Sequence, residues 1–220
     1  MILVRPSFEI LSIMGVGITD LAEKSLRLIE EAGRTCYKSG SPLTSESSKK
    51  FVKKLNDLGH ESVLEHSAMS VKLIIDRGVS HELVRHRLCA FSQESTRYCN
   101  YKGEVTFIIP PWCTDLGVGE YELPTNEILN PFTMEWLWAM QDAEDHYITL
   151  LQKWTPQQAR SVLPNSLKTE IVVTANFREW KHIFKLRCAK AAHPQMREVM
   201  IPLCEECKKL IPVIFDGIVY

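Results

Sequence analysis

The order of helical and extended patterns along the chain is the feature that most constrains its fold. Apolar residues recur at helical spacing in residues 20–33 and 47–58, before the first run rich in β-branched residues at 68–75. A second extended run at 105–109 is followed by a loop rich in Gly and Pro. Helices outnumber strands and do not alternate with them regularly, unlike the units of a doubly wound parallel sheet. The pattern predicts an α+β fold, with a mixed or antiparallel sheet flanked by helices.

Glycine and proline mark the expected ends of these elements. Gly33 and Gly59 are predicted to end the first two helices. The other predicted elements are, in chain order, a helix at 79–87, the longest helix along a stripe from Leu137 to Trp154, a short helix from Pro156 that carries Arg160, a strand at 171–174, and helices at 178–190 and 194–210, the last kinked at Pro202. No repeat or Gly/Ser-rich linker divides the chain, so residues 1–220 are predicted to form a single domain.

Charge is segregated along the chain. The 26 Lys and Arg nearly balance the 27 Asp and Glu, for a net charge of −1. Residues 103–152 hold nine acids and no Lys or Arg, so the remaining 18 acids leave the rest of the chain at +8. We expect the acidic segment to form an outer face or a subunit contact, and the basic regions to bind anionic ligands.

Hydropathy excludes several classes of protein. Hydrophobic residues make up 45% of the sequence, which is too many for a disordered chain with so little net charge. No apolar run reaches the roughly 18 residues of a membrane span, and no signal peptide opens the sequence. The sequence therefore predicts a folded cytoplasmic protein with no membrane partner.

An odd number of cysteines, seven, predicts reduced thiols. Cys204 and Cys207 have the C-x-x-C spacing of redox and zinc sites, but no second such pair exists. Because both lie in a predicted helix, we interpret them as packing residues.

The densest cluster of polar functional groups runs from Arg85 to Tyr98. It holds three arginines and a histidine within thirteen residues, followed by hydroxyl and amide side chains. The planar guanidinium of arginine binds phosphate at two points, which lysine cannot do. On a helix, Arg85 and Arg87 would point about 200° apart and could serve different anions. A solvated basic helix end explains the same residues equally well.

A second basic region extends from Arg160 to Arg197, with eight Lys or Arg and only two acids. A solvated face would normally mix charges of both signs to form ion pairs. Asn176 is placed to cap the helix that follows and to present its positive N-terminus to an anion.

The segment 59–66 contains two His and two Glu. The histidines are six residues apart and no H-E-x-x-H pattern occurs, so we expect no metal here. A polar loop facing a ligand and a simple connection between a helix and a strand both remain open. The sequence also lacks a P-loop, a G-x-G-x-x-G and a G-x-S-x-G pattern, so bound phosphates would be held by arginines.

Four of these motifs together resemble the flavin-dependent thymidylate synthases. The signature R-H-R, seven residues, Ser, x, R-Y is matched by Arg85-His86-Arg87 with Ser95-Thr96-Arg97-Tyr98. The other three matches are, in the family's order, Gly59-His60-Glu61 with Glu65-His66, Arg160-Ser-Val-Leu-Pro164, and Asn176-Phe177-Arg178 with the later Arg187.

The resemblance implies the reductive methylation of dUMP to dTMP. It implies 5,10-methylenetetrahydrofolate as the carbon donor, FAD as the hydride carrier and NADPH as the reductant of the flavin. It also implies a homotetramer with active sites at the subunit interfaces, and a mixed sheet with helices.

The motif positions also imply the site residues. The dUMP site would contain Glu82, Arg85, Gln93, Glu94, Ser95, Thr96, Arg97, Arg160 and Arg187. The FAD site would contain Ser62, Arg85, His86, Arg87, Gln93, Asn176, Phe177, Arg178 and His182. No metal is implied.

Arg187 is the residue to which we assign a catalytic role. A guanidinium always stays charged, so it can stabilise a uracil anion and leave C5 of the ring nucleophilic without an added thiolate. The redox step then belongs to the flavin, and none of the cysteines is needed as a nucleophile.

Two other functions are consistent with the same residues. A nucleic-acid-binding module could use the two basic regions, but the nearly neutral total charge and the lack of an aromatic RNA-binding motif oppose it. A non-catalytic nucleotide-binding or assembly protein is the other alternative. We predict the enzyme, with no nucleic-acid partner.

Overall fold

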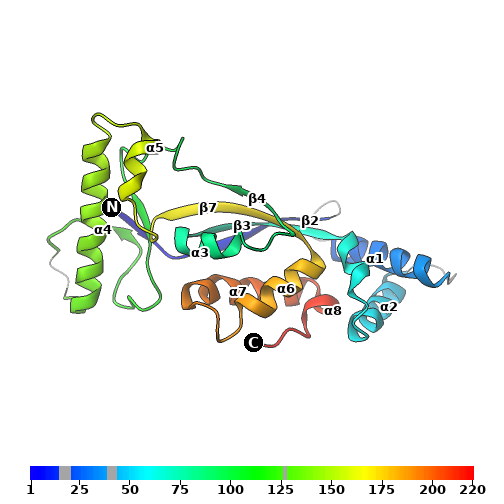
Figure 1. Cartoon of the computed structure of the whole chain (residues 1–220). Coiled ribbons are helices and arrows are strands. Elements are labelled where there is room, and N and C mark those ends of the chain that lie inside the picture. Colours follow the sequence, from blue (N-terminus) through cyan, green and yellow to red (C-terminus); the bar gives the residue numbers. More distant parts are fainter. Residues whose placement is uncertain (15–20, 39–43, 126–127) are drawn as a thin grey trace. The chain divides into compact units, whose positions relative to one another are not determined.

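The structure, a computed structural model, describes residues 1–14, 21–38, 44–125 and 128–220 (Figure 1). The described chain divides into two compact units, each built from separate stretches of sequence. Unit 1 consists of Met1–Ser7, Leu73–Arg85 and Ser92–Ile171, and unit 2 of Phe8–Lys72, His86–Phe91 and Val172–Tyr220. The single domain over residues 1–220 stays a prediction.

The elements form an α+β fold with a mixed sheet and flanking helices, which confirms the predicted class. In chain order they are β1 (Ile2–Val4), β2 (Ser7–Ile13), α1 (Leu21–Tyr37), α2 (Ser45–Asp57), the 3-10 helix η1 (Glu61–His66), β3 (Ala68–Asp76), α3 (Arg77–Leu83), β4 (Ala90–Gln93), β5 (Thr106–Ile108), β6 (Gly119–Glu120), α4 (Pro131–Leu150), α5 (Pro156–Ala159), the 3-10 helix η2 (Arg160–Val162), β7 (Lys168–Asn176), α6 (Phe177–Arg187), α7 (Pro194–Leu210) and α8 (Pro212–Phe215).

In unit 1, a three-stranded sheet of order β5-β1-β6 lies at the centre of an apolar cluster. β1 pairs in parallel with β5 and antiparallel with β6, so this sheet is mixed. Leu3 and Phe107, which are register partners, are fully buried together with Leu137 and Tyr147 of α4. The predicted strand at 105–109 and the predicted longest helix are thus both confirmed.

A second sheet has the order β2-β3-β7-β4. Along β3 and β7, buried residues alternate with half-buried ones, so one face of each strand is covered. Both strands were predicted, and both extend beyond the predicted residues by completing this alternation.

In unit 2, aromatic side chains of α6 form the core together with α8. Trp180 stacks on Phe184, with 5.5 Å between ring centroids, and Phe184 packs edge-on against Phe215 at 5.8 Å. The indole nitrogen of the buried Trp180 donates a hydrogen bond to the carbonyl of Met69, 3.0 Å away. These contacts attach α6 to β3 and so position its polar face.

Several predicted helix boundaries are wrong, among them the ends expected at Trp154 and Lys190, because α4 ends at Leu150 and α6 at Arg187. Gly33 does not end α1, which continues to Tyr37; a Cβ at Gly33 would lie 2.7 Å from Phe51 Cε1 and 2.8 Å from Leu55 Cδ1. Gly33 therefore permits close packing of α1 against α2 rather than a stop. The predicted start of α1 at Asp20 lies outside the described residues.

The helix predicted at 79–87 begins at Arg77 and ends at Leu83. Asp76 explains the earlier start, because its Oδ1 accepts a hydrogen bond of 2.7 Å from Val79 N and caps the helix. Arg85 and Arg87 therefore lie in turns, and the 200° separation predicted for a helix does not apply.

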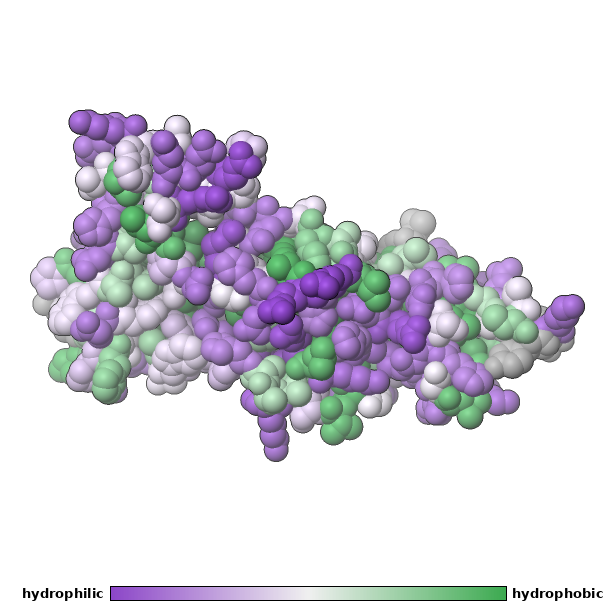
Figure 2. All heavy atoms as spheres, viewed as in Figure 1, coloured by the Kyte–Doolittle hydropathy of each residue, from purple (hydrophilic) through white to green (hydrophobic). Residues whose placement is uncertain are grey.

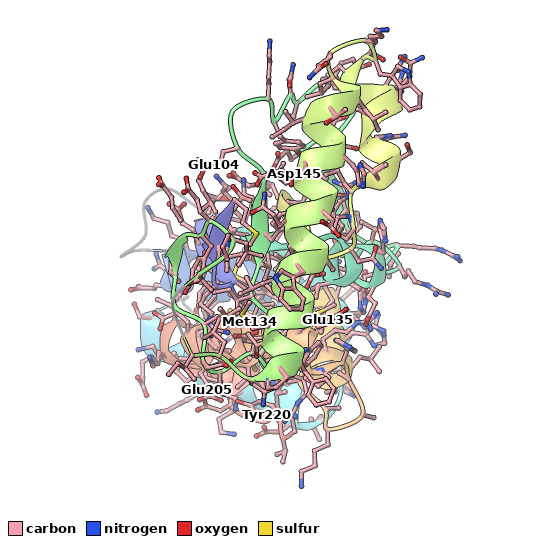
Figure 3. All side chains as sticks on the ribbon, turned by 90° about the vertical axis from the view of Figure 1, so that its left-hand side faces the viewer. Glu104, Met134, Glu135, Asp145, Glu205 and Tyr220 are labelled. Atoms are coloured by element: carbon pink, nitrogen blue, oxygen red, sulfur yellow. The ribbon has the colours of Figure 1, made fainter. Side chains whose placement is uncertain are left out.

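Most of the described acidic residues of segment 103–152 are exposed, so the choice between an outer face and a subunit contact stays open. Figure 3 shows Glu135 and Asp145 on α4, and both are exposed. Glu144 differs, because it is buried and its Oε1 accepts a hydrogen bond of 2.8 Å from Val105 N. The face shown in Figure 2 is largely hydrophilic, with hydrophobic residues in separate patches. Across the described chain, each helix is too short or too polar to cross a bilayer.

Candidate functional site

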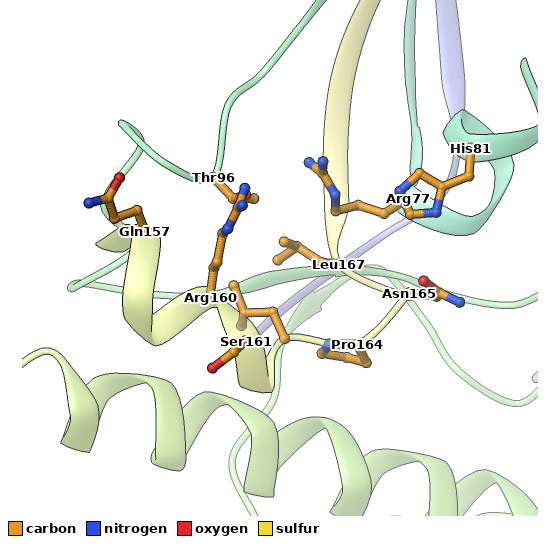
Figure 4. A pocket seen from close by; sticks show the side chains of 10 residues that line it. Arg77, His81, Thr96, Gln157, Arg160, Ser161, Pro164, Asn165 and Leu167 are labelled. Carbon is orange, nitrogen blue, oxygen red and sulfur yellow. The ribbon is translucent and has the colours of Figure 1, made fainter. Parts of the chain in front are cut away.

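Unit 1 contains a cavity of about 460 Å³ with a basic and polar lining. Arg77 is the first residue of α3, and Arg160 begins η2. Figure 4 shows the guanidinium groups of Arg77 and Arg160 extending toward the same space, with Thr96 beside Arg160. The described lining residues carry no carboxylate; they are Arg77, His81, Thr96, Gln157, Arg160, Ser161, Leu163, Pro164, Asn165 and Leu167.

The two guanidinium groups of this cavity contact neutral oxygens. Arg160 Nη1 donates to Thr96 Oγ1 at 3.0 Å. Arg77 Nη1 lies 3.4 Å from the carbonyl oxygen of Glu94 and 3.5 Å from Thr169 Oγ1. Because both positive charges are held by neutral partners, the cavity is suited to a phosphate dianion.

Thr96 and Arg160, both predicted for dUMP binding, line this cavity, and Gln93 belongs to the same network. Gln93 Nε2 lies 2.9 Å from Ser80 Oγ and 3.2 Å from Thr169 Oγ1, the hydroxyl that Arg77 also approaches. The sequence argument missed Arg77 and His81. Arg77 lies two residues after the strand predicted at 68–75, and this place near the end of a strand was the signal in the sequence that could have found it.

Glu94, also predicted for dUMP binding, has its carboxylate engaged within unit 1. It accepts hydrogen bonds from Tyr101 Oη at 2.6 Å and from Lys168 Nζ at 3.3 Å. Burial, together with this carboxylate, raises the pKa of Tyr101 well above its ordinary value. The hydrogen bond from Lys168 connects the end of β4 to the start of β7. The role of Glu94 in substrate binding stays a prediction.

The remaining residues predicted for dUMP are more open. Arg85 is exposed in the turn after α3, Glu82 is half-buried at the end of that helix, and Arg97 is exposed with its guanidinium 5.5 Å from the ring centroid of Tyr98. Ser95 Oγ accepts a hydrogen bond of 3.3 Å from Arg97 N. Their roles stay predictions.

Unit 2 contains a second cavity, of about 600 Å³, beside the N-terminal part of α6. Asn176 caps this helix as predicted, because its Oδ1 accepts a hydrogen bond of 2.8 Å from Glu179 N. Of the residues predicted for FAD, Asn176, Arg178 and His182 line the cavity. The complete described lining is Glu61, Glu65, Leu88, Asn176, Arg178, Glu179, His182 and Lys185.

Basic side chains beside this second cavity are paired with carboxylates from η1. Arg178 forms an ion pair with Glu65, and the buried Lys181 forms one with Glu61. Burial acts to raise the pKa of Glu61, but Lys181 and the nearby charges of Lys185 and Arg178 outweigh it and bring this pKa below its ordinary value. The segment 59–66 therefore includes lining residues of a cavity, and the ligand-facing alternative stays a prediction.

Arg187, the predicted catalytic residue, contacts His86 of the predicted flavin site. Arg187 Nε donates to His86 Nε2 at 2.9 Å, and His86 Nδ1 lies 3.4 Å from Glu179 Oε1. His86 and Glu179 are both buried. Burial first, then the charges of Arg187 and His182, lower the pKa of His86 to about 4, so this imidazole is neutral at pH 7.

The ligand atoms of His86, Glu179 and His182 lie within 4.8 Å of one another, a spacing that a divalent ion could bridge. The cation of Arg187 on His86 Nε2 opposes a second cation at this place. That no metal is bound stays a prediction.

Besides Arg85, His86 and Gln93, three other residues predicted for FAD do not line the second cavity. Ser62 and Arg87 are exposed, whereas Phe177 is fully buried and packs edge-on against Phe215 at 5.8 Å. The side chain of Phe177 is thus part of the core. The flavin roles of all three stay predictions.

The cysteines are free thiols, as predicted. Cys204 and Cys207 are buried in α7, and Cys207 Sγ lies 3.9 Å from Met69 Sδ, which agrees with a packing role. Burial, together with the charge of Glu179, raises the pKa of Cys89 to about 12, so this thiol is a poor nucleophile at neutral pH.

Comparison with known proteins adds a family to this geometry. Residues 18–213 match the family model described as thymidylate synthase complementing protein. The chain belongs to this family. A protein of Mycobacterium avium (strain 104) named flavin-dependent thymidylate synthase is 34% identical over 195 residues, which cover 86% of this chain and 77% of the relative. A protein of Corynebacterium diphtheriae with the same name is 32% identical over 206 residues, covering 90% and 81%.

Membership in the flavin-dependent thymidylate synthase family makes the chain an enzyme of thymidylate synthesis. This excludes the non-catalytic alternative and disfavours the nucleic-acid-binding module. It also makes a flavin the expected cofactor. Within the chain, the residues predicted for dUMP belong to unit 1 except Arg187, and those predicted for FAD belong to unit 2 except Arg85 and Gln93.

Proposed function

We propose that this enzyme converts dUMP to dTMP with 5,10-methylenetetrahydrofolate as the carbon donor and NADPH as the reductant. The methylene carbon is transferred to C5 of the uracil ring and is reduced to a methyl group by a hydride, while C5 loses its proton. The observation that carries the proposal is the cavity in unit 1, where two guanidinium groups are held by neutral oxygens without a carboxylate in the described lining.

In this proposal, the cavity of unit 1 holds the phosphate of dUMP. Arg160 and Arg77 supply charge and two-point hydrogen bonds, and the hydroxyl of Thr96 orients Arg160 through its 3.0 Å contact. Because the cavity of about 460 Å³ is large enough for more than a phosphate, it accommodates part of the nucleoside as well. Arg187 stabilises negative charge on the pyrimidine when N3 loses its proton.

The residues around the cavity of unit 2 fit FAD. The capped N-terminus of α6 offers backbone N–H groups to an anion, and Arg178 adds a cation. Leu88, which is 76% exposed, supplies apolar surface for a flat ring. The flavin, when bound and reduced, supplies the hydride; the protein binds it and orients it.

We further propose the homotetramer with active sites at the subunit interfaces. Large apolar side chains on unit 1 support an assembly, since Phe132 is 86% exposed, Trp112 57% and Trp138 51%. Light scattering of the purified protein at several concentrations tests the expected fourfold mass.

The direct test of the activity is formation of dTMP from dUMP, methylenetetrahydrofolate, FAD and NADPH. Omission of dUMP, methylenetetrahydrofolate or NADPH, or removal of all flavin, should abolish turnover, and tritium placed at C5 of dUMP should be released as water in proportion to dTMP. Formation of dTMP without added or bound flavin would overturn the proposal.

A further inference from the structure

Three side chains in unit 2 form a series of polar contacts that reaches Arg187, with one hydrogen bond between Arg187 and His86 and one ion-pair contact between His86 and Glu179. Glu179 Oε1 lies 3.4 Å from His86 Nδ1, and His86 Nε2 accepts a hydrogen bond of 2.9 Å from Arg187 Nε. The side chains of Glu179 and His86 are only 9% and 5% exposed. Such burial makes the direction of each hydrogen bond matter, because water cannot substitute for a lost partner.

The protons in this series can be assigned from the chemistry of the groups. Arg187 Nε always carries a hydrogen, so His86 Nε2 must be the acceptor. A neutral imidazole then carries its hydrogen on Nδ1, the atom that faces Glu179. The Glu179 carboxylate can accept this hydrogen, and it thereby selects the tautomer of His86 that can bind Arg187.

The charges around His86 favour the observed polar contacts over a bound cation. On α6, Arg187 contacts His86, and His182 lies with its ring centroid 5.8 Å away. Lys185 and Arg178 of the same helix line the neighbouring cavity. A divalent ion at His86, Glu179 and His182 would have to bind against these positive charges, whereas the observed contacts place a donor on Nε2 of His86 and a carboxylate 3.4 Å from its Nδ1.

We propose that Glu179 is a positioning residue which acts through His86 to orient the guanidinium of Arg187 toward the pyrimidine ring of the substrate. The hydrogen bond uses Nε of Arg187, so it sets the plane of the guanidinium, whose terminal amino groups carry the other N–H donors. This role rests on the proposed function of Arg187. Glu179 is not one of the motif residues, so the motifs alone give it no function.

The variant Glu179→Gln tests the proposal, because the amide can donate to Nδ1 of His86. That would move the imidazole hydrogen to Nε2, where it opposes the N–H of Arg187. We expect kcat to fall about 10- to 100-fold while flavin content and the melting temperature stay close to those of the parent enzyme. Glu179→Asp, which keeps the carboxylate, should retain more activity than Glu179→Gln. Glu46→Gln removes the same charge from an exposed site on α2 of unit 2 and should leave kcat unchanged.

A double-mutant cycle separates positioning from general stabilisation. If Glu179 acts through Arg187, Glu179→Gln should reduce turnover and dUMP affinity little further in an Arg187→Ala background. Equal losses in both backgrounds would overturn the proposal.

A third measurement does not depend on activity. In protein labelled with ¹⁵N-histidine, two-bond ¹H–¹⁵N correlations should show His86 protonated on Nδ1 in the parent protein and on Nε2 in Glu179→Gln. Protonation on Nε2 in the parent would overturn the proposal even if Glu179→Gln is inactive or unfolded. If the parent instead makes no dTMP but shows the Nδ1 tautomer, the proposed function fails while the series from Glu179 to Arg187 stands.

Discussion

The cavities of the two units differ in how their positive charges are compensated. In unit 1, Arg77 and Arg160 are held by hydroxyl and carbonyl oxygens, and the described lining contains no acid. In unit 2, the cavity has three carboxylates in its lining, and Arg178 is paired with one of them. The first arrangement favours a compact dianion. The second favours a larger ligand in which charge contributes a smaller share of the binding energy.

The difference shows that counting arginines does not locate a phosphate site. Both basic regions of the sequence contain arginines at useful spacing, but only the tertiary contacts decide which of them are neutralised. Four experiments test this distinction and the residues on which it depends.

The largest effect is expected for Arg187→Ala. Loss of a guanidinium that stabilises charge on the pyrimidine should reduce kcat by about 10²- to 10³-fold. Flavin content, measured from the absorbance of the purified enzyme, should be unchanged. Lys190→Ala, which removes an exposed cation just beyond α6, is the matched control. Loss of flavin from Arg187→Ala would assign this residue to the flavin site instead.

Arg160→Ala should weaken dUMP binding about 10- to 100-fold, because charge-assisted hydrogen bonds contribute about 1.5 to 3 kcal/mol each. FAD affinity should remain unchanged. Arg178→Ala should show the reverse selectivity with a smaller loss, since Glu65 already compensates this guanidinium. Calorimetric titration of both variants with both ligands measures the four affinities. Equal weakening of dUMP and FAD by Arg160→Ala would contradict the separation of the two sites.

Acidification should destabilise the protein through His86. Its pKa is lowered to about 4 in the fold, against an ordinary value of 6.5, so between these values the unfolded chain binds more protons. The free energy of unfolding should therefore decrease as pH falls from about 6.5 to about 4, by at most about 1.4 kcal/mol per pH unit. The pKa values of Glu30 and Glu61 are also lowered in the fold, and these two groups change the free energy of unfolding below pH 4.5, their ordinary pKa.

Urea unfolding followed by circular dichroism at several pH values measures this slope. His86→Asn should flatten it between pH 5 and 6.5, where only His86 among these three groups contributes. His146→Asn, at an exposed position on α4 of unit 1, is the control and should keep the parent slope. An unchanged slope in His86→Asn would show that His86 is not held neutral by burial.

The smallest effect is expected from salt. Raising ionic strength from 0.05 to 0.5 M should weaken dUMP binding several-fold, because screening acts on charges that have no carboxylate partner in the cavity. FAD binding should change less, since ion pairs already compensate the cations around its proposed site. A steeper salt dependence for FAD than for dUMP would reverse the proposed assignment of the cavities.

Most elements of the fold could be predicted from local pattern, and the exceptions have clear causes. β3, β7 and α4 were predicted because their apolar side chains recur with the period of a strand or of a helix, and these are the side chains that the fold buries. Four strands were missed. β1, β4 and β6 hold two to four residues, too few for a periodicity, and β2, although seven residues long, has only Ile13 buried. Gly33 was misread because its small size serves the contact with Phe51 and Leu55, which lie on a different helix.

The site was predicted only in part, because motifs reveal residues by their order and spacing along the chain. Order and spacing of the motifs identified Thr96, Arg160, Asn176, Arg178 and His182, all of which line a cavity. Arg77 and Glu179 were not assigned a site role, because neither belongs to a motif. Their significance depends on partners distant in sequence, Thr169 for Arg77 and His86 for Glu179.

The class of fold, the family and the residue types available for binding anions can all be predicted from the sequence. These follow from periodicity and spacing, which are local properties of the chain. Only the tertiary structure decided which cations keep their charge uncompensated and which tautomer of His86 is presented to Arg187. Both depend on burial and on the distance between side chains from separate segments, such as the 2.9 Å between Arg187 Nε and His86 Nε2. Electrostatic interactions strengthen steeply when water is excluded, so their outcome is set by packing rather than by order along the chain.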